Sequence, residues 1–203
     1  MILSLNEVEA LAKKATRGAG YSWGLAEEAS KAVRFLCHRG LDGCGALADV
    51  LQRFDGVGVE YCVPFCENGL WQTNAGDMCP IYLGAALSDR ADHVLVQPFR
   101  TSAVAQPFLL VPFAAQVACA ITDTVTLTDG AVRIVTDGKQ IAMQGSCDSR
   151  STGVVLKKGG SLADPLIHSS RAVVEDAIWA QLNAFAHRTY APATEESRAK
   201  GAG

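Results

Sequence analysis

The stretch that decides the fold reads VTLTDGAVRIVTDGKQIAMQ and spans residues 125–144. Within it, runs of alternating apolar and polar residues are separated by Asp129-Gly130 and Asp137-Gly138. Alternation with a period of two is typical of a strand that buries one face, and Asp-Gly between two such runs indicates a tight hairpin. The sequence therefore predicts a meander of antiparallel strands. We expect these strands at residues 122–128, 131–136 and 139–144, followed by a fourth strand at 151–157.

Helical patterns lie on both sides of this β-rich stretch. The first helix is predicted to begin at a capping box formed by Ser4 and Glu7. A second helix is expected at about 22–38, a third after its N-cap Asp42, and a last one at about 170–188. Because helices and strands are segregated along the chain, the sequence predicts an α+β fold. Its parts are an N-terminal three-helix segment, a central mostly antiparallel sheet with a hairpin meander, and a C-terminal helix with an extended tail.

The segment between the third helix and the meander contains shorter patterns. Residues 108–119 are apolar throughout, which fits either a strand or a helix. We prefer a strand that is broken near Pro112. The remaining expectations are a strand at 57–64, a loop at 68–77, a helix at 80–90, a strand at 93–97 and a loop at 98–107.

Length and composition indicate one folded unit. The chain has 203 residues, of which 49% are hydrophobic and 19% are charged. Such a chain has enough apolar material for one core and is not typical of a disordered protein. We expect a single domain over residues 1–203, with a helical segment at 1–56, a β-rich segment at 57–160, and the C-terminal helix and tail at 165–203.

The charge and the start of the chain bear on partners and location. The net charge is −3 at pH 7, whereas nucleic-acid-binding domains are usually basic. The chain begins MILSLNE, without the basic start and apolar run of a signal peptide. The most apolar stretch, residues 107–121, is too short to cross a bilayer. We therefore expect a cytoplasmic protein with no nucleic-acid partner and no membrane partner.

The chain has seven cysteines, a residue type that forms disulfides and binds metal ions. Their odd number, in a chain of this length without an export signal, argues against a disulfide framework. Cys62 and Cys66 are the only close pair, with Cys79 as a further candidate ligand, but their spacing is not that of a zinc site. We therefore expect no bound metal and interpret the thiols as small buried hydrophobic groups.

A glycine-rich turn, RGAGYSWG at residues 17–24, is the first candidate site. Free amides, the positive end of a helix and a serine hydroxyl together suit an anion, and an arginine adds a bidentate contact. The alternative is a tight turn between helices, with its tryptophan in the core. The turn is not a P-loop, which disfavours nucleotide hydrolysis. The candidate ligand-binding residues here are Arg17, Gly18, Gly20, Ser22 and Trp23.

The C-terminal tail is the second candidate. It carries donors, acceptors and a fixed charge, but no helical or strand pattern that would order it unaided. Its candidate ligand-binding residues are Tyr190, Thr194, Glu195, Ser197 and Arg198. We expect the tail to meet the glycine-rich turn and to close one shared site for a small anionic metabolite. The alternatives are a tail that covers a groove on its own core and a frayed end without a role.

Two further polar segments are weaker candidates. Residues 71–77 fit a binding loop or an ordinary surface loop. Asp89 or Asp92 is placed to orient the imidazole of His93, and the alternative is a histidine at a solvated strand edge. No Ser-His-Asp or Cys-His pattern and no G-x-S-x-G motif is present. Whether the protein is an enzyme therefore stays open, and the sequence identifies no cofactor.

The two ends of the chain carry a resemblance to a known family. Residues 3–12 (LSLNEVEALA), 17–29 (RGAGYSWGLAEEA) and 189–198 (TYAPATEESR) resemble an uncharacterised bacterial family of conserved proteins of unknown function. This resemblance implies no activity. Residues 5–56, in which two helices are followed by RGLDGCG at 39–45, faintly resemble the N-terminal part of the malate/L-lactate-type NAD(P)-dependent dehydrogenases. In those enzymes a Ser-His pair follows the aspartate, whereas this chain has Gly43 and Cys44.

Three functional hypotheses follow from these residues. The first is a protein that binds a small anionic metabolite. The second is a non-catalytic accessory or assembly protein, for which a homo-oligomer is an open option. The third is a degenerate dehydrogenase-like module. The position of the tail separates the first two, because a tail over the turn favours ligand binding and a tail in another subunit favours assembly.

Overall fold

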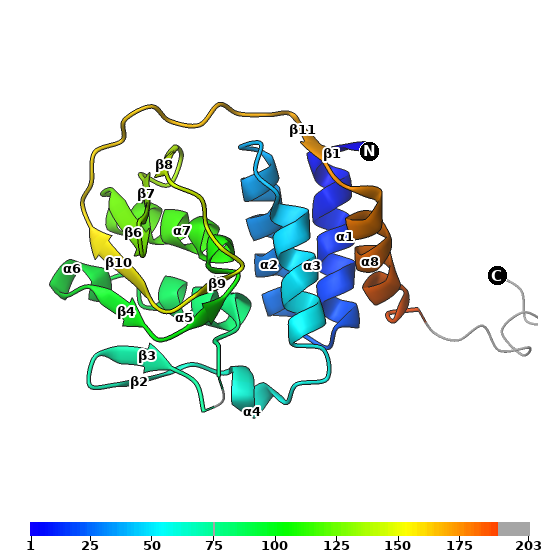
Figure 1. The fold of residues 1–203 in the computed structure, drawn as a ribbon, viewed down its shortest axis with the longest axis horizontal. Helices are drawn as coiled ribbons and strands as arrows, with labels where there is room; N and C mark the ends of the chain where they lie inside the picture. Colours follow the sequence, from blue (N-terminus) through cyan, green and yellow to red (C-terminus); the bar gives the residue numbers. More distant parts are fainter. Residues whose placement is uncertain (75, 191–203) are drawn as a thin grey trace, which may run out of the picture.

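The protein consists of a helical layer beside a layer built on a β-sheet (Figure 1). The computed structural model describes residues 1–74 and 76–190. The helical layer contains α1 (Leu5–Gly18), α2 (Trp23–Cys37), α3 (Gly43–Arg53) and α8 (Asp176–His187). Within this layer α1 contacts both α2 and α8, and α3 contacts α2 and α8.

The predicted starts of the first three helices are confirmed by their N-caps. The Ser4 hydroxyl accepts from the Glu7 amide at 3.2 Å, and the Glu7 carboxylate accepts from the Ser4 amide at 2.8 Å. The Ser22 hydroxyl accepts from the Leu25 amide at 3.3 Å. The third helix begins directly after Asp42, as predicted. These contacts satisfy amides that have no partner within the helix, so local sequence alone sets where each helix begins.

The second layer is a seven-stranded sheet with the order β2-β3-β4-β10-β6-β7-β8. Its neighbouring strands run antiparallel except for β3 and β4, which are parallel. Together with the helical layer, it confirms the predicted α+β fold. The strands are β2 (Phe65–Glu67), β3 (Leu70–Gln72), β4 (Phe99–Thr101), β6 (Val125–Asp129), β7 (Val132–Thr136), β8 (Ile141–Gln144) and β10 (Val154–Lys158).

The predicted meander is formed by β6, β7 and β8. Gly130 is the first of the two residues between β6 and β7 and has a φ of 56°, which glycine adopts without strain. Residues 137–140 join β7 to β8, and the Asp137 carboxylate accepts from the amides two and three residues later at 2.8 and 2.7 Å. The expected fourth strand is β10, but it pairs with β6 and β4 instead of extending the sheet beyond β8.

Two helices connect the sheet to the helical layer. These are α5 (Pro80–Asp89) and α7 (Val111–Ile121). Both contact α2, and α7 also contacts β6 and β7. Leu36 of α2, Phe113 of α7 and Leu127 of β6 are almost fully buried in one hydrophobic cluster. The two layers therefore share a core.

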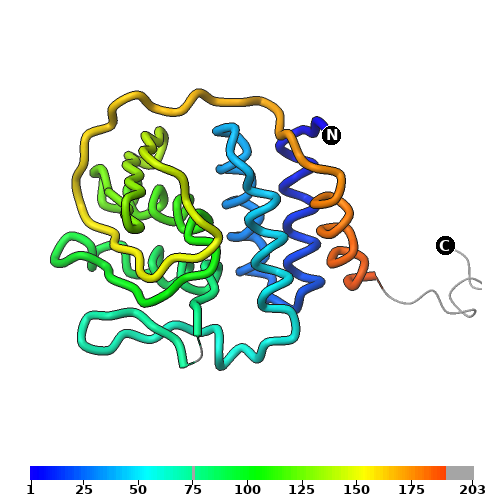
Figure 2. The backbone as a smooth tube through the Cα atoms, viewed as in Figure 1, coloured from blue at the N-terminus to red at the C-terminus, as the bar shows by residue number. Residues whose placement is uncertain are grey.

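A long return segment brings the chain back from the sheet to the helices. After β10 the chain crosses over the molecule in an extended path (Figure 2). It then enters β11 (Arg171–Val173), which pairs antiparallel with β1 (Ile2–Ser4). A second small sheet pairs β5 (Val104–Ala105) with β9 (Arg150–Ser151). The pairing of β1 with β11 places α8 next to α1.

Three predicted strands are wrong because short apolar runs do not distinguish strand from helix. Residues 57–64 contain the short helix α4 (Val59–Cys62), and residues 93–97 contain α6 (His93–Val96). Residues 108–119 belong to the 3₁₀ turn η1 (Pro107–Leu110) and to α7. Pro112 does not break a strand, because it lies in the first turn of α7, where its missing N–H has no partner to lose.

Two expected loops and one helix boundary also change. The loop at 68–77 contains β3, and the loop at 98–107 contains β4 and β5. These strands have two or three residues, too few for an alternating pattern to show. The last helix begins at Asp176 and not near residue 170, because residues 171–173 pair with the N-terminal strand.

Candidate functional site

A groove of about 670 Å³ lies where the end of α1, the start of α2 and the end of α8 meet. We call it the basic groove. Three of the predicted site residues line it, so the structure brings the glycine-rich turn and the start of the tail to one place. Its lining residues are Ala10, Lys13, Lys14, Arg17, Trp23, Arg188, Thr189 and Tyr190.

The two glycines of the turn shape this groove through the backbone. A Cβ atom on Gly18 would lie 1.7 Å from the backbone oxygen of Phe185, so only glycine allows α1 to approach α8 this closely. Gly20 has a φ of 95°, a conformation that side chains disfavour, and it turns the chain toward α2. Neither glycine lines the groove, but both determine which side chains meet in it.

Arg17 and Trp23 form one wall of the groove. The Arg17 guanidinium donates to the backbone oxygen of Tyr21 and lies 4.6 Å from the centre of the Trp23 ring. Trp23 is 67% exposed, so the interpretation that places it in the core is wrong. It is the first residue of α2, and its side chain projects beside the end of α1. The result is a fixed cation next to an exposed indole face.

The backbone of the turn offers less to an anion than its sequence indicates. The amides of Ala19, Gly20 and Tyr21 already donate to carbonyl oxygens in the last turns of α1. The Ser22 hydroxyl accepts from the Leu25 amide as the N-cap. The amides of residues 19–21 are therefore not free to bind an anion, and the lysine and arginine side chains supply the positive charge of the groove.

The four cations of the groove are only partly neutralised. Lys13 lies 3.4 Å from Glu27. Arg188 donates two hydrogen bonds of 2.6 and 3.0 Å to Asp55, and this contact holds the pKa of Asp55 below its usual value. Within the described part of the chain, Lys14 forms no ion pair. Four cations therefore face two carboxylates, and one of these, Glu27, also pairs with Lys31.

The tail reaches the groove at its first residues. Tyr190 lies in the lining, is 58% exposed, and has its ring centre 5.4 Å from that of His187. The other predicted tail residues lie outside the described residues. They are Thr194, Glu195, Ser197 and Arg198.

Sequence reasoning missed three of the four cations in the groove. Lys13 and Lys14 stand four and three residues before Arg17, so one turn of α1 carries all three positive charges. This spacing is visible in the sequence and indicates a positively charged face on the first helix. Arg188 has no such signal, because its position beside α1 depends on the packing of two helices far apart in the chain.

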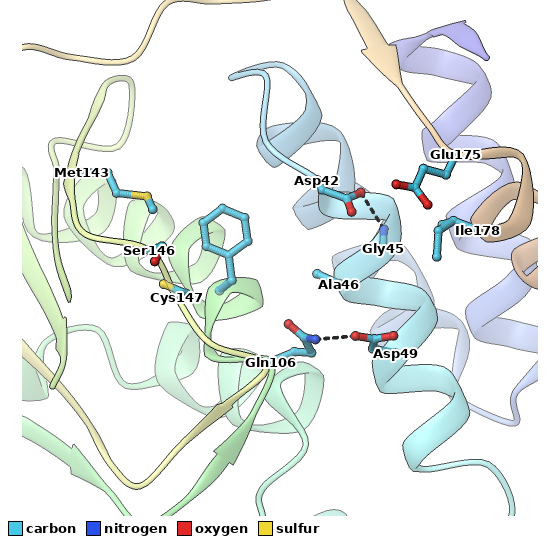
Figure 3. A pocket seen from close by; sticks show the side chains of 11 residues that line it. Asp42, Gly45, Ala46, Asp49, Gln106, Met143, Ser146, Cys147, Glu175 and Ile178 are labelled. Atoms are coloured by element: carbon cyan, nitrogen blue, oxygen red, sulfur yellow. Dashed lines mark hydrogen bonds between the residues drawn. The ribbon is translucent and has the colours of Figure 1, made fainter. Parts of the chain in front are cut away.

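A second hollow, of about 410 Å³, lies between α3, the start of α8 and the segment after β8 (Figure 3). We call it the acidic groove, because its lining contains three carboxylates and no cation. The side chains drawn in Figure 3 converge on it from both layers of the protein. Its lining residues are Asp42, Gly45, Ala46, Asp49, Gln106, Phe108, Met143, Ser146, Cys147, Glu175 and Ile178.

Two of these carboxylates have structural roles. The Asp42 carboxylate accepts from the Gly45 amide at 2.8 Å and caps α3. Asp49 accepts from the Gln106 side chain at 2.6 Å and so links α3 to the sheet layer.

The acidic groove also contains a thiol, Cys147. Burial, and then two nearby aspartates, raise the pKa of the Cys147 thiol to about 11. This thiol is protonated at neutral pH and is not poised as a nucleophile.

The weaker candidates are absorbed into the fold. In the loop at 71–77, Asp77 is buried and forms ion pairs with Arg53 and Arg150. His93 lies in α6 and not at a strand edge. Its Nε2 atom is 3.0 Å from the side-chain amide nitrogen (Nε2) of Gln97. The His93 imidazole therefore contacts the Gln97 side chain and not the carboxylate of Asp89 or Asp92.

Four of the seven thiols are buried, as expected, but two are exposed and Cys147 is half-buried. Cys66 and Cys119 are exposed, whereas Cys37, Cys44, Cys62 and Cys79 are buried. Over residues 1–74 and 76–190, no group of three or more His, Cys, Asp or Glu side chains is arranged to hold a metal ion. No helix in these residues is long and apolar enough to span a membrane.

Part of the chain matches a known family. Residues 3–79 match the family described as "Protein of unknown function (DUF3726)". The resemblance to an uncharacterised family is thus confirmed over this range, which contains the glycine-rich turn. The tail motif lies beyond the matched residues. No curated protein and no solved structure matches the chain.

The packing of α3 against α2 explains why Asp42, Gly43 and Cys44 follow one another in this chain. Asp42 caps α3, and a Cβ atom on Gly43 would lie 2.7 Å from the backbone oxygen of Val33. A larger residue at position 43 would therefore force α3 away from α2. Cys44 is almost fully buried. These residues form a close helix junction.

Proposed function

We propose that this protein binds a small anionic molecule in the basic groove. One observation carries the proposal: four cations and two exposed aromatic rings line one hollow, and none of the described lining residues is acidic. A concave site with converging charged groups is the usual form of a small-molecule site. The charge that attracts the ligand comes from lysine and arginine side chains, which pair with carboxylates and phosphates.

We further propose that the tail closes this groove. Thr194, Glu195, Ser197 and Arg198 would then contribute donors and acceptors to the bound anion, together with Tyr190. The position of Tyr190 in the lining supports this, because the tail leaves the last helix at the edge of the groove. Deleting residues 191–203 tests it: we expect weaker anion binding and a lower melting temperature. An unchanged affinity and melting temperature would refute the closing tail.

A thermal-shift screen with carboxylates, phosphates and nicotinamide cofactors is the first test of the binding function. We expect anions to raise the melting temperature, because a ligand that binds only the folded state stabilises it. The double variant Lys14→Gln/Arg17→Gln should lose this response. Lys157→Gln is the matched control, because it removes one exposed charge from β10 in the sheet layer. A response that the double variant retains in full would exclude the groove as the site.

Binding without catalysis is the simpler function of this groove. Its described lining contains no His, Cys, Asp or Glu, the side chains that most often act as general bases or nucleophiles.

We propose that the protein acts in the cytoplasm and as one domain. Seven cysteines without a disulfide support a reducing compartment, and the core shared by both layers supports one domain.

A second candidate function, assembly, is favoured by one exposed apolar segment. Six large hydrophobic residues, from the end of α3 to the first residue of β3, are 38–55% exposed. Monomeric proteins seldom expose such residues together. A second copy of the chain is the partner to test, by light scattering of the protein and of the variant Tyr61→Ser/Val63→Asp. A concentration-independent monomer would exclude this function. The exposed residues are Val57, Val59, Tyr61, Val63, Phe65 and Leu70.

A further inference from the structure

The unneutralised charge of the basic groove is concentrated on one helical turn. Glu27 pairs with Lys13 and is shared with Lys31, and Asp55 pairs with Arg188. The surplus therefore falls on Lys14 and Arg17, which are three residues apart on α1 and so share a face. The complement of two cations this close together is a compact group with two negative charges.

A phosphate monoester meets this requirement better than a dicarboxylate does. It carries a charge of about −1.5 to −2 at pH 7 and three acceptor oxygens on one atom. A dicarboxylate spreads the same charge over two separate groups. Arg17 uses its guanidinium for one backbone contact, to Tyr21, and retains further N–H donors for a phosphate oxygen.

The rest of the groove suits a flat aromatic body. Trp23 and Tyr190 are 67% and 58% exposed, and both line the groove that Lys14 and Arg17 line. Exposed aromatic faces next to a phosphate-binding cation are the combination on which nucleobases stack. The volume of about 670 Å³ is far larger than a phosphate ion needs and lies in the range of sites for drug-sized ligands.

We infer that the ligand of the basic groove is an aromatic phosphate monoester, such as a nucleoside monophosphate, with its phosphate on Lys14 and Arg17 and its ring on Trp23 or Tyr190. This inference rests on the proposed anion-binding function and narrows it to one chemical class. Binding alone is inferred, and no bond of the ligand is broken.

Titration calorimetry with four probes tests the inference: adenosine monophosphate, adenosine, inorganic phosphate and succinate. We expect adenosine monophosphate to bind at least about 5-fold more tightly than inorganic phosphate and succinate, since stacking one base contributes about 1–3 kcal/mol. It should also bind more tightly than adenosine, which lacks the phosphate that pairs with Lys14 and Arg17. The double variant Trp23→Leu/Tyr190→Leu, which removes both exposed rings of the groove, should remove the advantage of adenosine monophosphate over inorganic phosphate and leave phosphate binding unchanged. Val96→Ala, which shortens an exposed apolar side chain of α6 outside the groove, should change neither affinity.

The outcomes separate this inference from the function on which it rests. Equal affinity for adenosine monophosphate and inorganic phosphate would refute the aromatic body. Equal affinity for succinate and adenosine monophosphate would refute the phosphate. In both cases anion binding itself would stand. If none of the charged probes and no anion of the thermal-shift screen binds, the proposed function falls together with the inference.

Discussion

The basic groove and the acidic groove lie at opposite ends of α8. The C-terminal end of this helix contributes Arg188 to the basic groove, and its N-terminal end contributes Glu175 to the acidic groove. These signs follow the helix dipole, which favours cations at C-termini and anions at N-termini. The dipole of α8 therefore explains the signs of Arg188 and Glu175, but not what these charges do.

The two grooves differ in how their charged side chains are used. In the acidic groove, Asp42 caps a helix and Asp49 accepts a hydrogen bond from the sheet layer. In the basic groove, Lys14 forms no ion pair with a described residue, and the Lys13 contact with Glu27 is exposed. The comparison suggests that carboxylates of the acidic groove stabilise the fold, whereas cations of the basic groove are available to a ligand.

The largest expected effect comes from separating α1 and α8 where they meet beside the basic groove. Gly18→Val should destabilise the protein by about 3 kcal/mol, because the new side chain would overlap the backbone oxygen of Phe185 and push α8 away from α1. Urea denaturation measures this. Gly24→Ala is the matched control, because nothing lies within 4 Å of its Cβ position, and it should be neutral or slightly stabilising. Equal stabilities for the two variants would show that α1 and α8 do not meet at Gly18.

A smaller effect is expected from the acidic groove. Asp42→Ala should lower the free energy of unfolding by about 1 kcal/mol, because α3 loses its N-cap. Lys14→Gln in the basic groove should change stability by less than about 0.5 kcal/mol, as is usual for exposed positions. Measuring both variants by denaturation and by anion titration sharpens the comparison. Equal weakening of anion binding by Asp42→Ala and Lys14→Gln would contradict the different roles of the two grooves.

The smallest effect concerns the ion pair that restrains Arg188. Its contact with Asp55 lowers the pKa of that carboxyl, so the pair contributes stability above the unfolded pKa of about 3.9 and loses it as the pH falls through the lower folded value. Asp55→Asn should remove this acid-dependent part of the stability curve. It should also strengthen anion binding at neutral pH, because one more cation of the groove is released. Unfolding curves with the same acid dependence in both proteins would contradict the pair.

Much of the fold was predictable from local signals. The capping box at Ser4, the N-caps Ser22 and Asp42, and the paired hairpins of the meander each depend on residues a few positions apart. The helices α4, α6 and α7 were not, because short or wholly apolar runs have no informative period. The strands β4 and β5 were missed because pairing with distant partners, not local pattern, creates them.

The candidate site divides along the same line. Arg17 and Trp23 were found because a glycine-rich turn before a helix is a local signal. Gly18 resembled an ordinary turn glycine, whereas its requirement comes from α8, which lies more than 150 residues later in the chain. The position of Arg188 depends on the same contact. The cations of the groove thus became a site only when two ends of the chain were packed together.

The most direct test of the account is to map where an anion binds on the ¹⁵N-labelled protein by nuclear magnetic resonance. On addition of inorganic phosphate, we predict shifts of the backbone amides of Lys14 and Arg17 and of the indole N–H of Trp23, with none at Asp42 or Asp49. This pattern would place the ligand in the basic groove and leave the acidic groove empty. Shifts confined to the acidic groove, or no shifts at saturating phosphate, would contradict the account.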